Sequence, residues 1–251
     1  MSPGDIVLVA AAGLACGVIN TVAGGGSLIL FPALLATGMP TLAANVTNSL
    51  GTWPGYLGGV VGFRREIDEL RHHLRPFLVA NILGSTTGCV LLLVTPGDTF
   101  DVLVPWLVIF AALLTAVQPE VKRRALASGR VDGGSPGMLS IGAVFLATIY
   151  GGYFGAALGV ILIGVLGLTI HETMQRVTAL KTVLSLLDAT VSVVIFGLFG
   201  PVRWVAVAVA APTTLIGGYL GAAVARRLDE NVLRASVVAF GIAVGIYLFF
   251  R

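Results

Sequence analysis

One long apolar segment, residues 177–199, carries polar side chains at helical spacing. They follow one another at i, i+4, i+7 and i+11 and so share one face of a helix: Lys181, Ser185, Asp188 and Ser192. Ionisable groups at membrane depth are costly and usually face a cavity or one another. The spacing therefore predicts a polar face that lines a binding cavity.

The two charged members of this face favour different chemistry. Lys181 would neutralise a bound anion, with hydrogen bonds donated by Thr178, Thr182 and Ser185. Asp188 is a poor ligand for an anion, but a carboxyl group inside a membrane protein can carry a proton. The alternative is an ion pair between Lys181 and Asp188 that holds helices together, although seven residues is a long separation for a direct pair. The sequence leaves proton coupling and ion pairing open.

A glycine triplet followed by serine, Gly24-Gly25-Gly26-Ser27, interrupts the first apolar run, residues 6–35. Glycines here break a membrane-buried helix and are tolerated where the freed backbone lines a cavity. We expect Ser27 to cap a half-helix over residues 28–37. Its positive dipole end and unused N–H groups would then bind an anion, as in transporters with broken helices. The alternative is that the glycines only permit close helix packing.

The segment after this break carries neutral polar side chains that suit an anion which must also be released. Asn45, Asn48 and Thr52 share one helical face, with Thr47 and Ser49 beside it. Their alternative role is hydrogen bonding between helices, which is also what we expect of Asn81, Ser85 and Thr86 further along the chain. The expected substrate-binding residues are Gly24, Gly25, Gly26, Ser27, Asn45, Asn48, Ser49, Thr178, Lys181, Thr182 and Ser185.

Composition places these residues in a membrane. Of 251 residues, 57% are hydrophobic and 11% charged, against about 25% charged in a soluble domain; the mean hydropathy is +0.98. The basic residues cluster in short loops, which is typical of topology signals rather than of nucleic-acid binding. Phosphate-loop, HExxH and paired DxxxD motifs are absent from the sequence. We therefore expect neither an enzyme nor a cofactor or metal site.

Two pairs of short apolar segments flank glycine-rich breaks. Residues 6–20 and 28–37 surround the triplet, and residues 138–149 and 158–168 surround Gly151-Gly152-Tyr153-Phe154-Gly155. Most of these segments fall short of the roughly 20 residues that a spanning helix needs, so each pair predicts a broken or re-entrant helical hairpin. Three longer apolar segments follow each hairpin: 42–63, 76–94 and 102–117, then 177–199, 202–224 and 232–250.

The basic loops orient the chain. By the positive-inside rule three loops are cytoplasmic, which places both termini outside. Each half then crosses the membrane an odd number of times, so the second half is inverted. We expect an all-α polytopic membrane protein of two inverted-topology repeats, residues 1–117 and 137–251, joined by a cytoplasmic linker over 118–136. The basic residues are Arg64, Arg65, Arg71 and Arg75, then Lys122, Arg123, Arg124 and Arg130, then Arg226, Arg227 and Arg234.

Four stretches of the first half resemble one transporter family. Residues 13–17, 24–35, 38–40 and 45–49 are similar to the corresponding stretches of the TauE/SafE family of sulfite exporters, also called toluene-sulfonate uptake permeases. The second half repeats the pattern in looser form, because Gly155-Ala-Ala-Leu-Gly159 and Gly164 replace the family's glycine cluster and proline.

The resemblance implies a bacterial inner-membrane permease for sulfite, an organosulfonate or a related sulfur oxyanion, working by alternating access. Composition and spacing alone reach only a small anion. The alternative is an anion channel or facilitator without a coupling ion. The sequence leaves open which anion is carried, in which direction, and whether the chain forms a homodimer.

Overall fold

The computed structural model describes residues 1–22, 25–62, 67, 71–127, 137–170, 173–224 and 230–250. Within them the regular structure is α-helical. The helices are α1 (Pro3–Val22), α2 (Ser27–Ala36), α3 (Thr41–Gly62), α5 (Arg71–Val94), α6 (Gly97–Ala127), α7 (Met138–Tyr153), α8 (Leu158–Thr169), α9 (Met174–Phe199), α10 (Trp204–Val224) and α11 (Glu230–Phe249).

The outer surface of this helical assembly is apolar. Among the described residues, four helices are long and apolar enough to cross a membrane, over Pro3–Asn20, Leu74–Val94, Gly97–Val121 and Gln175–Phe199. Large apolar side chains such as Val79, Val102 and Leu198 are exposed on these helices. A soluble protein would bury such a surface, whereas lipid solvates it. The chain is therefore a multi-pass membrane protein, as its composition predicted.

Several helices extend beyond their apolar segments. α6 continues past residue 117 to Ala127, so the start of the expected linker is helical, and α7 continues through Gly151 and Gly152 to Tyr153. Basic residues that we placed in loops belong to helix ends: Arg75 to α5, Arg124 to α6 and the buried Arg234 to α11. Arg64, Arg65, Arg130, Arg226 and Arg227 lie outside the described residues.

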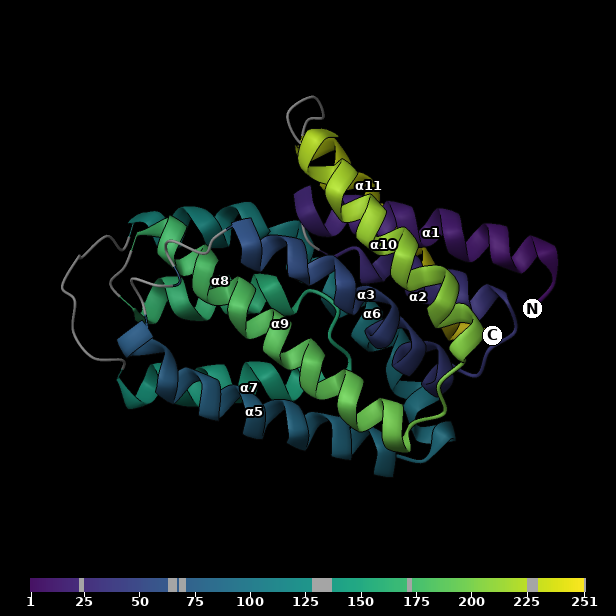
Figure 1. Cartoon of the computed structure of the whole chain (residues 1–251), viewed down its shortest axis with the longest axis horizontal. Helices are drawn as coiled ribbons and strands as arrows, with labels where there is room; N and C mark the ends of the chain where they lie inside the picture. Colours follow the sequence, from purple (N-terminus) through teal and green to yellow (C-terminus); the bar gives the residue numbers. More distant parts are fainter. Residues whose placement is uncertain are drawn as a thin grey trace.

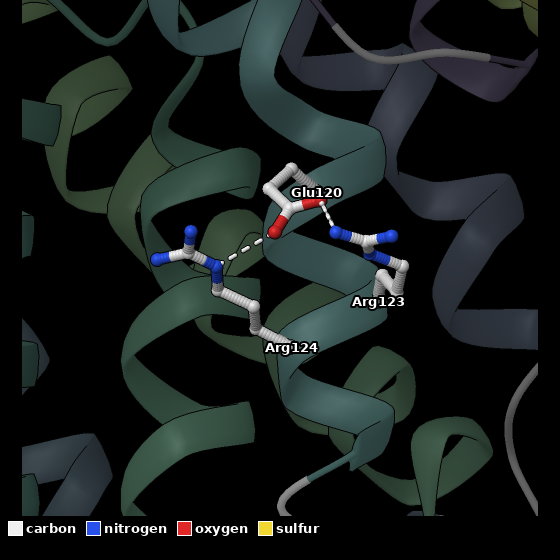
Figure 2. A network of polar contacts seen from close by, with 3 residues as sticks. All are labelled: Glu120, Arg123 and Arg124. Carbon is white, nitrogen blue, oxygen red and sulfur yellow. Dashed lines mark hydrogen bonds and ion pairs between the residues drawn. The ribbon is translucent and has the colours of Figure 1, made fainter.

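An ion-paired cluster marks the end of α6. Glu120 accepts from Arg123 Nη2 at 2.6 Å and from Arg124 Nε at 2.7 Å (Figure 2). Both pairs lie within one helix and are largely exposed, so they add little stability. The orientation rule depends on Lys and Arg and hardly on Glu. The pairing therefore leaves the topology argument unchanged.

The helices pack in pairs that correspond between the two halves. α1 packs on α10 as α7 packs on α5, and α3 packs on α10 as α9 packs on α5. Likewise α2 contacts α11 as α8 contacts α6, while α3 meets α9 and α6 meets α11. If α1, α2, α3, α5 and α6 are exchanged with α7, α8, α9, α10 and α11, the first three pairs become their counterparts in the other half. The pairs α3 with α9 and α6 with α11 map onto themselves. In Figure 1, α1 and α10 lie at one side of the molecule and α5 and α7 at the other, with residue 1 and residue 250 at the same end.

Glycines bring the backbones of the two crossed pairs into contact. A Cβ on Gly17 of α1 would meet the Thr214 carbonyl oxygen of α10, and one on Gly217 would meet the Leu14 carbonyl oxygen. On the other side, a Cβ on Gly152 of α7 would meet the Ser85 carbonyl oxygen of α5. Small residues permit this approach in membranes, where close van der Waals packing drives helix association. Each hairpin is therefore packed against a helix from the opposite half.

Candidate functional site

The break of the first hairpin is held by backbone and by Asn20. Gly25 has φ +83°, a left-handed conformation that suits glycine. The Gly26 N–H donates to Asn20 Oδ1 at 2.8 Å, and the Leu28 N–H donates to the Gly25 carbonyl at 3.0 Å. Gly24 lies outside the described residues.

The expectation that Ser27 caps α2 is wrong. Gly26 is the N-cap, no side chain caps the helix, and Ser27 is its first residue. The reason is that the turn starts earlier: the Leu28 and Ile29 N–H groups donate to the Gly25 and Gly26 carbonyls. Those two N–H groups are therefore satisfied by backbone and are not available to an anion in this arrangement.

The break of the second hairpin is held by side chains from both halves. Gly155 has φ +75°, and Ala157, the N-cap of α8, has φ +62°. The Tyr150 hydroxyl donates to the Ala156 carbonyl at 2.8 Å. Asn45 Nδ2, from α3 of the first half, donates to the Tyr153 carbonyl at the end of α7, at 3.1 Å. The orphan carbonyl of a broken helix is thus satisfied from the opposite half.

A ladder of polar contacts joins α9 to α5. Asn81 Nδ2 donates to the Leu184 carbonyl at 3.0 Å, and Ser85 Oγ donates to Asp188 Oδ1 at 2.6 Å. One turn further, Cys89 Sγ and Ser192 Oγ lie 3.4 Å apart. The prediction that Asn81 and Ser85 join helices is confirmed. The same contacts fix the position of the buried Asp188 carboxyl, which is only 4% exposed.

A small cavity lies where α3 and α9 meet the two hairpin breaks. A water molecule's centre can reach about 20 Å³ of it, which is room for about one water. α3 and α9 approach each other closely here, since Trp53 Nε1 donates to Thr190 Oγ1 at 3.0 Å. The lining comes from both halves: Ser27, Asn48, Ser49, Thr52, Tyr56, Gly151, Phe154, Gly155, Leu158, Ser185, Asp188, Ala189 and Ser192.

Two buried polar atoms of this lining have no hydrogen-bond partner: Asn48 Oδ1 and Ser185 Oγ. Other lining hydroxyls donate to backbone, since Ser49 bonds the Asn45 carbonyl and Thr52 bonds the Ser49 carbonyl. Buried polar groups without partners are uncommon in folded proteins. A ligand in the cavity that accepts from Ser185 Oγ and donates to Asn48 Oδ1 would satisfy both atoms.

The cavity collects some of the residues expected to bind substrate. Ser27, Asn48, Ser49 and Ser185 line it, together with Asp188. They come from α2, α3 and α9, which lie far apart in the sequence. The polar faces expected to line a binding cavity therefore meet in one place.

Other expected residues lie outside the lining. Gly25 packs against Thr115 of α6, and Asn45 bonds α7. Thr182 Oγ1 donates to the Thr178 carbonyl within α9 at 2.7 Å. The Lys181 side chain lies against Gly159, at the start of α8. Gly26 is buried in the first break.

Tyr56 belongs to the cavity but was not among the residues singled out from the sequence. Its position carried a usable signal, because it follows Ser49 at i+7 and Thr52 at i+4 on α3. Thr52 and Ser192 were recognised on polar faces but not as substrate contacts. Among the described residues, no group of three or more His, Cys, Asp and Glu side chains is placed to hold a metal ion.

A helical, multi-pass membrane protein with a buried polar cavity at two broken hairpins belongs to the class of membrane transporters. Comparison with protein families agrees, since residues 9–248 match the model described as sulfite exporter TauE/SafE. The chain belongs to this family.

Curated relatives cover most of the chain. A probable membrane transporter protein, ORF9, from Sinorhizobium sp is 27% identical over 237 residues, 92% of this chain and 87% of the relative. A probable membrane transporter protein from Haemophilus influenzae is 27% identical over 229 residues, which cover 90% of this chain and 87% of the relative. The probable membrane transporter protein YfcA of Escherichia coli K12 is 27% identical over 234 residues, covering 88% and 81%. No solved structure matches the chain.

Proposed function

We propose that this protein is a secondary transporter for a small anion, most simply sulfite, an organosulfonate or a related sulfur oxyanion. The observation that carries the proposal is the cavity at the junction of both hairpins, into which Ser185 presents an unpartnered hydroxyl donor. Family membership supplies the sulfur chemistry. The protein would move its substrate without chemical change, in the inner membrane of a bacterium.

We further propose that the halves are inverted-topology repeats, with both termini outside. The corresponding helix pairs support this arrangement, as do the glycine contacts of both crossed pairs. The cavity adds an independent correspondence. α3 contributes Ser49, Thr52 and Tyr56 at i, i+3 and i+7, and α9 contributes Ser185, Asp188 and Ser192 at the same spacing. A site between inverted repeats is typical of secondary transporters.

The size of the cavity favours alternating access over a permanently open pore. Room for about one water is less than a sulfur oxyanion needs, so the walls must separate for substrate to enter. Each hairpin packs on a helix of the opposite half, so a movement of one half relative to the other would move a hairpin as well. Such motion would open the cavity to one side at a time.

The proposed roles follow from position. Ser185, Ser49 and Asn48 would contact the anion, with Ser27 at the start of α2. Lys181, against the start of α8, would attract the anion to the second break. Gly25 and Gly26 would keep the first break narrow. Gly24, Thr178, Thr182 and Asn45 complete the expected site around the cavity.

The test is uptake of radiolabelled sulfite into proteoliposomes, compared with sulfate and methanesulfonate and with protein-free vesicles. We expect saturable flux of sulfite or the sulfonate. Absence of flux for all three anions would refute the proposal. Unitary current steps in a planar bilayer would favour a channel instead.

A further inference from the structure

The charge of the cavity limits what it can hold. Asp188 is the one charged residue among the described residues of the lining, whose other polar members are hydroxyls and an amide. Lys181 lies two turns before Asp188, about 10 Å along the helix axis, and packs against Gly159 rather than lining the cavity. A carboxylate in a confined space repels a second negative charge. An anion beside Asp188 therefore needs a compensating positive charge in the same cavity.

The groups facing Asp188 hold its carboxyl in place without neutralising it. Ser85 of α5 donates to Oδ1, and on α7 a Cβ on Gly151 would approach the same oxygen to 2.6 Å. In the described part of the chain, the titratable neighbours of Asp188 are Tyr56 on α3 and Cys89 on α5. Tyr and Cys side chains are neutral near pH 7. The compensating charge must then come with the substrate.

The donors of the cavity show where a proton would act. Ser185 lies one helical turn before Asp188 and has an unpartnered hydroxyl, so it can donate to one oxygen of an anion. A protonated Asp188 would donate to a second oxygen of the same anion. The carboxyl group would then change from a repelling charge to a hydrogen-bond donor.

We propose that the cavity takes up a monoanion only together with one proton, which lies between Asp188 and the anion. This inference rests on the proposed function and adds the charge class of the substrate. The empty cavity holds a carboxylate, and the loaded cavity holds a carboxylic acid and a monoanion, so both carry one negative charge. Each cycle moves one anion and one proton in the same direction without net charge. A dianion such as sulfate would leave a second negative charge in the cavity and is excluded.

The experiment measures coupling in the unmodified protein. Proteoliposomes take up radiolabelled methanesulfonate, a monoanion across the pH range used, under a pH gradient or a potassium diffusion potential, while an internal dye reports proton entry. Electroneutral cotransport predicts about tenfold accumulation per pH unit. It also predicts that a membrane potential of about 100 mV leaves the accumulation of methanesulfonate unchanged. The same potential would shift the distribution of an uncoupled monoanion about 50-fold. Sulfite is the second probe, with protein-free vesicles as its control.

Variants assign the proton to Asp188. Asp188→Asn keeps the shape but cannot exchange a proton, so its flux should lose the response to the pH gradient and follow the potential. Asp98→Asn removes an exposed carboxyl at the start of α6, outside the cavity, and should behave as the unmodified protein. If Asp188→Asn does not fold, the pH gradient and the diffusion potential applied to the unmodified protein still test whether a proton moves with the anion.

Two results would overturn the inference in different ways. Flux of the unmodified protein that follows the potential and carries no proton refutes the coupling but leaves the transport function intact. If neither methanesulfonate nor sulfite is transported, the proposed function is refuted, and the coupling is refuted with it.

Discussion

The two hairpins build similar breaks from different residues. The first uses glycine at the left-handed position and an acceptor from its own helix, Asn20. The second places Ala157 in the left-handed region, where an L residue with a Cβ is strained by about 1–2 kcal/mol. It offsets that strain with the Tyr150 hydroxyl and with Asn45 from the opposite half. The first break thus combines a left-handed glycine with a side chain of its own hairpin, and the second combines a left-handed alanine with a side chain from the opposite half.

The same contrast appears in the cavity. At corresponding positions of the i, i+3, i+7 pattern, α3 has Thr52 and α9 has Asp188. Thr52 bonds its own helix, whereas Asp188 is tied to α5 through Ser85. Similar backbone architecture in the two halves therefore supports an asymmetric site, because the charged residue of the described lining, Asp188, comes from the second half.

The largest effect should come from filling a crossed helix contact. Gly152→Leu would drive a side chain into the Ser85 carbonyl of α5, and overpacking of this kind costs about 3 kcal/mol. We expect loss of monodisperse protein or a much lower melting temperature in detergent. Gly142→Leu on the same helix faces open space and is the control. Equal melting temperatures and monodispersity of the two variants would contradict the close contact between Gly152 and the Ser85 carbonyl. Gly17→Leu should match Gly152→Leu if the crossed pairs are equivalent.

Removing the cation at the second break should abolish stabilisation by the anion. At 100 times its dissociation constant a ligand stabilises by about 2.7 kcal/mol. Lys181→Ala should lose most of the corresponding thermal shift with sulfite, while Arg124→Ala, at the exposed end of α6, should keep it. An unchanged shift in Lys181→Ala would contradict the proposal that Lys181 attracts the anion to the second break.

Crowding the first break should stop transport with a smaller loss of stability. Gly25 and Gly38 have φ +83° and +81°, so leucine at either strains the backbone by about 1–2 kcal/mol. A Cβ on Gly25 would lie 3.1 Å from Thr115 Oγ1, whereas nothing lies within 4 Å at Gly38. We expect Gly25→Leu to express without flux and Gly38→Leu to retain flux. Normal flux in Gly25→Leu would show that the glycine triplet serves only helix packing and not transport.

The smallest effect concerns the side chains of the second break. Tyr150→Phe removes the hydroxyl that bonds the Ala156 carbonyl and should cost about 1 kcal/mol. Tyr219→Phe, an exposed position on α10, should leave the melting temperature unchanged. If Tyr150→Phe melts like the unmodified protein, side-chain anchoring does not distinguish the second break from the first.

Patterns within a single segment were readable from the sequence. The apolar segments gave the helices, because composition and length dominate in lipid. The polar face with Ser185 and Asp188 was visible as a period of 3.6 residues. The break at Gly25 was predictable because consecutive glycines destabilise a helix and readily adopt a left-handed conformation.

Contacts between distant segments were not readable. Ala157 carries no sequence signal for a left-handed conformation, since its strain is offset by tertiary contacts. The N-cap is Gly26 rather than Ser27 because the turn of α2 already starts at Gly25, and Asn20, six residues earlier, accepts from the Gly26 N–H. The position of Lys181 against Gly159 depends on how α8 packs against α9, and no local sequence pattern predicts this packing. The packing of each hairpin against a helix of the opposite half was not predictable from the sequence for the same reason.

The most direct test of the cavity as the substrate site is anomalous diffraction at the selenium edge. Crystals would be grown with selenite, the selenium analogue of sulfite, at a concentration that inhibits sulfite flux. We expect one strong peak between α3 and α9, within hydrogen-bonding distance of Ser185 and Asn48 and beside Asp188. A peak elsewhere, or an empty cavity at a concentration that inhibits flux, would contradict the account.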